Sequence, residues 1–211
     1  NWTAVDSTVE LTFIVTGIVF VLVNGFLIYC VVKFRHKEGH RAHYEPENKK
    51  LEIILIAITS IGVIAMLAPG LFVWANFVDV PDDALEVEVV GQQWRWSYRY
   101  PGSDGVFGST DVSHMTHENP LGINPEDPSG QDDVIVYNAD LRLLKDRPVK
   151  LWLRSKDVLH NFTVAQFRVK MDLVPGMVTH LWLTPTLAGE YDILCEELCG
   201  VAHYAMRGRV I

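Results

Sequence analysis

The chain contains 211 residues, of which 49% are hydrophobic, and its formal net charge is −8 at pH 7. A chain this acidic has no basic surplus with which to bind phosphates, so we expect no nucleic-acid partner. The apolar residues are concentrated in the first third of the chain, and this uneven distribution favours a membrane anchor over a single soluble core.

Two long apolar stretches occupy that first third. Residues 11–32 are almost free of charge, and residues 51–77 contain only Glu52, near their start. Each stretch reaches the ~20 apolar residues that cross a bilayer, whereas two buried core helices of this length would need a far larger soluble core. The sequence therefore predicts an antiparallel transmembrane helical hairpin within residues 1–77.

The connector over residues 33–50 predicts the orientation of this hairpin. It carries six Lys or Arg residues against three Glu residues, and such an excess marks the cytoplasmic side of a membrane. Both termini and residues 78–211 are then expected on the periplasmic side of a bacterial inner membrane, or of an equivalent energy-transducing membrane. Cys30 would lie in the lipid bilayer, where we expect it to be inert.

Residues 78–211 are predicted to form an all-β domain, because short β-forming segments alternate with Pro, Gly and Asp turns, as in a sandwich or barrel. The predicted strands are residues 85–90, 94–100, 134–138, 149–153, 178–183 and 189–193, and a strand-like segment covers 207–211. Residues 102–133, rich in Gly, Pro, Ser and Asp, are predicted to be a long surface loop. The first residue, Asn1, fits both a removed leader and missing early residues.

Residues 195–206 concentrate soft metal ligands near the C-terminus. Cys195, Cys199, His203 and Met206 supply two thiols, an imidazole and a thioether, which is the ligand set that copper prefers. A mononuclear blue copper site needs one Cys, whereas two thiolates can bridge two copper ions. A disulfide at this spacing would be strained, and zinc rarely takes Met, but these two alternatives stay open.

A two-copper centre needs a second imidazole, and His160 is the best candidate. It follows the alternating segment 149–153 and lies about one β-hairpin upstream of the cysteine motif. Ligands that are distant in sequence often meet in β-sandwich sites. The alternative is a buried structural histidine.

Four motifs in this order, preceded by a two-helix anchor, resemble subunit II of cytochrome c oxidase: residues 91–98, 157–160, 169–176 and 195–206. The resemblance implies an α+β membrane protein, with an N-terminal two-helix transmembrane hairpin and a C-terminal all-β, cupredoxin-like Greek-key domain. It implies that this domain holds a binuclear copper centre, CuA. Partners would be subunit I, which alone holds haem and CuB, and subunit III.

The resemblance also implies roles for individual residues. The copper ligands would be His160, Cys195, Glu197, Cys199, His203 and Met206. Both cysteines would bridge the metals, each histidine would cap one metal, and Met206 would be a weak ligand. Glu197 would offer copper its backbone carbonyl, while its carboxylate would bind magnesium or manganese at the border with subunit I.

Two further positions gain roles from the resemblance. Trp94 is similar to the family's tryptophan that receives electrons, although a tryptophan in an aromatic strand also fits core packing. Glu52 is similar to a glutamate at the mouth of a proton pathway, although it also fits a side chain that snorkels to the headgroups. Arg95 and Arg99 depart from the family pattern around this tryptophan, which argues against a strongly basic donor there.

The implied function is electron relay. Cytochrome c, or a cognate c-type cytochrome, would reduce CuA, and haem in subunit I would receive the electrons for reduction of O2 to water with proton translocation. Residues 78–211 contain 12 Lys or Arg and 20 Asp or Glu, a net charge of 12 − 20 = −8, which would steer a basic donor. A CuA-containing nitric oxide reductase and a copper-free quinol oxidase subunit II remain alternatives.

Overall fold

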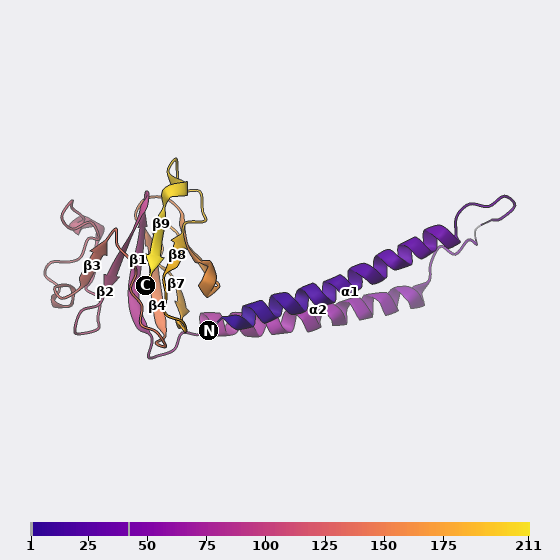
Figure 1. Ribbon diagram of the computed structural model, residues 1–211, viewed down its shortest axis with the longest axis horizontal. Helices are drawn as coiled ribbons and strands as arrows, with labels where there is room; N and C mark the ends of the chain where they lie inside the picture. The colour runs from indigo at the N-terminus through magenta and orange to yellow at the C-terminus, as the bar shows by residue number, and fades with distance from the viewer. Residues whose placement is uncertain (1, 42) are drawn as a thin grey trace. The chain divides into compact units, whose positions relative to one another are not determined.

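The computed structural model describes residues 2–41 and 43–211. It divides into two compact units, one formed by Thr3–Ala75 and the other by Asn76–Ile211 together with Trp2. The first unit is helical, and the second is built from β-strands (Figure 1).

Helix α1 spans Thr3–Lys33, and helix α2 spans Lys49–Val78. Each has a mean hydropathy of 2.5 over its most apolar stretch, and no residue of either helix is buried. Helices of 31 and 30 residues rise farther than the ~30 Å hydrocarbon layer. The prediction of two long apolar helices is confirmed, and both extend beyond the predicted spans because polar flanking residues continue the helical hydrogen bonding.

The β unit contains two sheets. The five-stranded sheet has the order β3-β2-β1-β4-β7, and the four-stranded sheet has the order β6-β5-β8-β9. The strands are β1 Leu85–Gln92, β2 Arg95–Tyr100, β3 Val134–Tyr137, β4 Val149–Ser155, β5 His160–Val164, β6 Val169–Leu173, β7 Thr179–Leu183, β8 Tyr191–Leu194 and β9 Arg207–Val210. Strand β1 pairs with β4 in parallel, and the other strand pairs are antiparallel.

The hydrophobic core lies between these sheets. Strand β4 alternates buried and partly exposed residues, so Leu151 and Leu153 face inward, as the period of a strand requires. Across the core, the ring of Trp96 on β2 meets that of Phe162 on β5 edge to face, with centroids 5.8 Å apart. Strands cross between the two sheets rather than following chain order. This arrangement confirms the predicted C-terminal β domain, which is built from two packed sheets.

Two strands were absent from the sequence prediction, β5 and β6. All five residues of β5 are buried, including the polar His160, Asn161 and Thr163. Because polar residues occupy buried positions there, the strand lacks the apolar alternation on which the prediction depended. Strand β6 does alternate, but over only five residues. The pairing of β5 with β8 is what carries His160 toward the cysteine segment.

Residues 102–133, here named the acidic excursion, form a long connection between β2 and β3. They contain two short 3-10 helices and one isolated bridge, between Thr110 and Ile123. Carboxylates tie the connection together, since Asp127 accepts the backbone N–H of Ser109 at 2.8 Å. The excursion holds seven Asp or Glu residues and no Lys or Arg, so it carries nearly all of the net charge of the β unit.

The structure removes Arg99 from the argument, made from the sequence, that Arg95 and Arg99 oppose a strongly basic donor near Trp94. Arg99 is only 1% exposed. Its guanidinium donates to Asp133 at 2.9 Å and contacts Glu88 at 3.3 Å. An arginine held between two buried carboxylates stabilises the attachment of the acidic excursion and is not accessible to a partner protein.

Candidate metal centre

The centre is built on the loop between β8 and β9. Cys195 immediately follows β8, and Met206 immediately precedes β9, so both ends of the loop are fixed by a paired strand. The sulfur atoms of Cys195 and Cys199 lie 3.7 Å apart, and both thiols are free and buried. This separation is well beyond the ~2.05 Å of a disulfide bond. The loop therefore presents two separate thiols to one small space.

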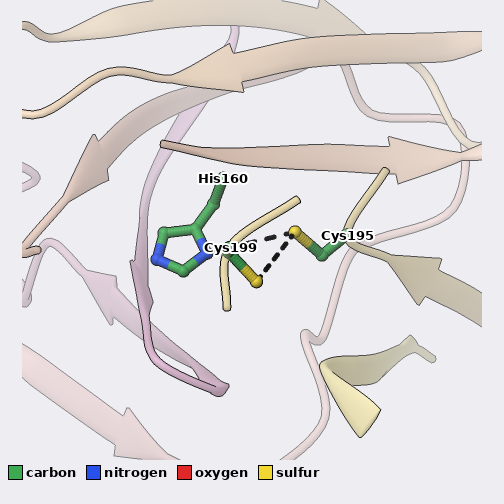
Figure 2. Close-up of side chains that lie close together, drawn as sticks. All are labelled: His160, Cys195 and Cys199. Carbon is green, nitrogen blue, oxygen red and sulfur yellow. Dashed lines mark hydrogen bonds between the residues drawn. The ribbon is translucent and has the colours of Figure 1, made fainter. Parts of the chain in front are cut away.

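His160 comes to this space from the neighbouring strand. It is fully buried at the start of β5, and its Nδ1 lies 3.9 Å from the sulfur of Cys195, although the two residues are 35 positions apart. His160, Cys195 and Cys199 place their ligand atoms within 4.8 Å of one another. Figure 2 shows the imidazole and both sulfurs close together.

Three further groups of the same loop surround the thiols. Nδ1 of His203, on the short 3-10 helix His203–Ala205, lies 3.4 Å from the sulfur of Cys199. The sulfur of Met206, a residue that is 1% exposed, lies 3.8 Å from that of Cys199. The backbone carbonyl of Glu197 lies 3.2 Å from the sulfur of Cys195. The structure thus brings the donors of this segment together with His160.

Asp157 holds the imidazole of His160 in place. Its Oδ1 lies 2.8 Å from Nε2 of His160 and accepts the N–H of Val158 at 2.7 Å, while Oδ2 accepts the N–H of Gln93 at 2.8 Å. A proton on Nε2 leaves the Nδ1 lone pair facing the thiols, the orientation that a carboxylate imposes on metal-binding histidines. Burial acts to raise the pKa of Asp157, but these hydrogen bonds together lower it. The sequence assigned no role to Asp157.

The Cys199 thiol is protonated near neutral pH when no metal holds it. Burial, followed by the hydrogen bond and charge interaction with Cys195, raises the pKa of Cys199 to about 11. A thiolate is the form that binds metal. Metal binding at this centre must therefore release protons.

Trp94 lies against the ligand loop. It is half-buried in the turn between β1 and β2, and its Nε1 donates to the carbonyl of Cys199 at 3.3 Å. Nε2 of Gln93 donates to the same carbonyl at 2.8 Å. Gly200 has a positive φ, and a β-carbon there would lie 3.2 Å from the Trp94 indole, so the close approach requires glycine. Trp94 is therefore in direct contact with the backbone of the ligand loop.

The donor set discriminates between metals. Two thiols, two imidazole nitrogens, a thioether and a carbonyl match the ligands that copper takes, whereas structural zinc sites use Cys and His without Met. Two free sulfurs also allow each thiolate to contact more than one ion. The residues present therefore fit copper better than zinc.

Two glutamates, Glu197 and Glu52, have predicted roles other than binding copper through their side chains. The Glu197 side chain is half-buried beside the loop, and hard cations such as magnesium prefer carboxylate oxygens of this kind. Glu52 lies in the first turn of α2, in the helical unit, and its side chain is exposed.

Comparisons with known proteins agree on one family. The sequence profile described as cytochrome c oxidase subunit II, periplasmic domain, matches residues 85–210. The chain is 57% identical over 211 residues to an alternative cytochrome c oxidase subunit 2 of Bradyrhizobium diazoefficiens, covering 100% of this chain and 76% of that protein. It is 30% identical over 195 residues to a probable cytochrome c oxidase subunit 2 of Rickettsia bellii, covering 92% of this chain and 68% of that protein.

A solved structure is also similar in part. It is the crystal structure of the periplasmic domain of subunit II of cytochrome oxidase from Bradyrhizobium japonicum, with 25% identity and a TM-score of 0.45. The match covers 63% of this chain and 86% of that one.

Proposed function

This chain belongs to the cytochrome c oxidase subunit II family, and on that premise we propose that it accepts electrons at a binuclear copper centre and delivers them to haem in subunit I. The chain is thus a subunit of a haem-copper oxidase and, with its two apolar helices, a membrane protein. The oxidase would reduce O2 to water and translocate protons, with subunits I and III as partners of this chain.

One observation carries the proposal: two free, buried sulfurs 3.7 Å apart, each with an imidazole Nδ1 within 3.9 Å. Cys195 and Cys199 would bridge the two coppers, while His160 and His203 would each bind one of them. The thioether of Met206 would complete the set together with a backbone carbonyl of the loop. When bound, the copper pair would supply a one-electron redox couple shared between two ions.

The surrounding residues would keep that centre rigid and dry. The thiols and Met206 are buried, and Asp157 fixes the imidazole of His160 through Nε2. Fixed ligands limit the movement that accompanies a change of charge, and a hydrophobic shell tunes the redox potential of a metal site. Trp94 would receive the electron from the donor, because its indole donates to the carbonyl of a ligand, Cys199.

The carboxylates of Glu197 and Glu52 would act at the contact with subunit I. The Glu197 carboxylate would bind magnesium or manganese at the border, since these cations prefer oxygen ligands. Glu52 would sit at the mouth of a proton pathway on the cytoplasmic side, because the basic connector over residues 33–50 favours that side. The β unit and both termini would then be periplasmic.

Metal analysis combined with electron paramagnetic resonance on the purified oxidase complex tests the copper proposal. We expect two coppers per chain that share one unpaired electron in the oxidised state. Zinc at the site, a single copper, or a bond between the two sulfurs would contradict the proposal.

The alternative functions are less well supported. The two relatives described above are named as cytochrome c oxidase subunits, which favours O2 over nitric oxide as the terminal substrate. A copper-free quinol oxidase subunit lacks the copper ligands, whereas this chain retains all the residues expected to bind copper. Measuring the consumption of O2 and of nitric oxide by the same purified complex separates the two gases directly.

A further inference from the structure

We propose that the face around Trp94 docks a soluble redox protein through an acidic surface of that protein, with Arg95 and Arg207 as the residues that recognise it. The inference rests on the proposed function, because it specifies the chemistry of the protein that would deliver electrons at Trp94. That protein loses one electron as the centre behind Trp94 gains it.

A groove beside Trp94 is the structural basis. Its volume is about 430 Å³, and its walls include Trp94, Arg95 at the start of β2, and both Arg207 and Arg209 from β9. Strand β9 therefore delivers two arginines to a groove that Trp94 lines. The same tryptophan contacts the ligand loop through the carbonyl of Cys199.

The arginines of the groove differ in how they are neutralised. Arg209 lies 3.0 Å from Asp140 and 3.0 Å from Glu190, so its charge is satisfied within the chain. Arg95 is exposed and donates to the neutral side chain of Gln92 at 3.3 Å. Arg207 is exposed as well and forms no ion pair with the residues that the structure describes. Two positive charges are thus available to a partner.

The groove contains two acidic residues, Asp140 and Asp192. Asp140 is paired with Arg209, so only Asp192 is left to offset the charges of Arg95 and Arg207. A further cation lies close to Arg95. The pKa of Lys156 is lowered, chiefly by burial and next by the charge of Arg95, which places both cations near one another. Asp157 lies near Lys156 as well and offsets its charge. Within the groove three arginines face two carboxylates, so the groove itself is net positive.

The same region has an apolar part. Gly200 lies against the Trp94 indole, and the next residue, Val201, is 88% exposed. Protein interfaces commonly combine an apolar centre with a polar, charged rim. Trp94 borders both this apolar part of the ligand loop and the groove that contains Arg95 and Arg207. Such a face fits a partner with acidic residues around its own apolar contact.

The negative charge of the β unit lies elsewhere. The acidic excursion holds seven of its acidic residues and no basic one, and none of the seven lines the groove. The net charge of −8 over residues 78–211 therefore does not describe the surface at Trp94. A strongly basic donor would be attracted to the excursion rather than to the groove.

The test measures electron uptake by the intact purified oxidase complex in a stopped-flow instrument. The two donors are a basic mitochondrial-type cytochrome c and the same cytochrome with its surface lysines maleylated, which makes it acidic. We expect the acidic derivative to react faster at low ionic strength and to slow as salt is added. We also expect the double variant Arg95→Glu/Arg207→Glu to slow that reaction about tenfold or more.

Arg147→Glu is the matched control, because it makes the same kind of charge change on an exposed arginine at the opposite end of the sheet, just before β4. It should leave both rates close to those of the unchanged protein. The inference is overturned if the double variant behaves like this control, or if the basic cytochrome is the faster donor and slows with salt.

The same experiment separates a failure of the proposed electron-transfer function from a failure of the proposed docking surface. If the complex lacks the copper signal, or takes no electrons from either cytochrome or from a small inorganic reductant, the proposed function fails. If copper is present and electrons pass at rates that ignore Arg95 and Arg207, only the docking inference fails.

Discussion

Asp157 links the parts of the candidate centre at the scale of single residues. One of its oxygens orients His160, and the other accepts the backbone N–H of Gln93, which precedes Trp94. The same carboxylate therefore connects the proposed electron-receiving turn to a proposed copper ligand. No apolar period or ligand spacing marks such a residue in a sequence, because its role depends on which groups the fold places beside it.

Replacing this carboxylate, in Asp157→Ala, should weaken copper binding by about 10- to 100-fold, the usual effect of removing a group that orients a metal-binding histidine. Competition with a copper chelator measures the affinity. Asp192→Ala, on an exposed carboxylate of β8, is the control and should bind copper normally. Equal affinities for the two variants would show that Asp157 does not orient His160.

Copper retention should decrease as the pH falls. The pKa of Cys199 is raised to about 11, so at lower pH the free thiol is protonated and metal binding must release that proton. The apparent affinity then falls about tenfold per pH unit for each proton released. Chelator competition at several pH values near neutrality measures the slope, and a flat profile would contradict a thiolate site.

At the scale of elements, the acidic excursion depends on a buried ion pair. Arg99 on β2 reaches Asp133 at the end of the excursion and Glu88 on β1, and the side chains of all three are buried. Acidic residues with no base among them would repel one another in a free loop. The arginine and the carboxylate-to-backbone hydrogen bonds explain why this connection is held against the sheet.

The variant Arg99→Met should destabilise the β unit by about 3–5 kcal/mol, because it leaves the Asp133 carboxylate buried without its cation. Denaturant unfolding of the full chain in detergent measures the loss. Arg95→Met is the control, since it removes an exposed arginine from the same strand and should change the stability by about 0.5 kcal/mol at most. Similar stabilities for the two variants would count against the buried pair.

At the scale of the whole molecule, the chain divides its tasks between two units. The helical unit is apolar and has no buried residue in either helix, as suits a membrane anchor. The β unit holds the candidate centre, and nearly all of its net charge lies on one long connection. The donors of the centre come from strand β5 and from the loop that joins β8 to β9, so binding of metal should stabilise the pairing of these elements.

Removing copper with a chelator should therefore lower the thermal unfolding midpoint of the β unit by several degrees. A ligand that binds only the folded state contributes about 4 kcal/mol at a thousandfold excess over its dissociation constant. Calorimetry of the complex before and after chelation measures the shift, and restoring copper should reverse it. An unchanged midpoint would mean that the metal does not bridge these elements.

The sequence by itself determined the two apolar helices, because apolar runs of this length typically form membrane-spanning helices. It also determined the soft donors in residues 195–206, because Cys, His and Met clustered in one segment are typical of a metal site. The sequence predicted most strands within a few residues but missed β5, whose buried polar residues follow no apolar alternation, and the short strand β6. Features of this kind are visible in a sequence because they depend on residues within one segment.

Only the tertiary structure decided which distant residues meet. Strand pairing sets His160 beside Cys195, gives Asp157 its place behind the imidazole, buries Arg99 and brings Arg207 to the side of Trp94. Most of these contacts join residues separated by tens of positions, and the identity of a side chain does not reveal which strand will lie next to it. The fold therefore determined the geometry of the candidate metal centre and the charge of the groove beside Trp94.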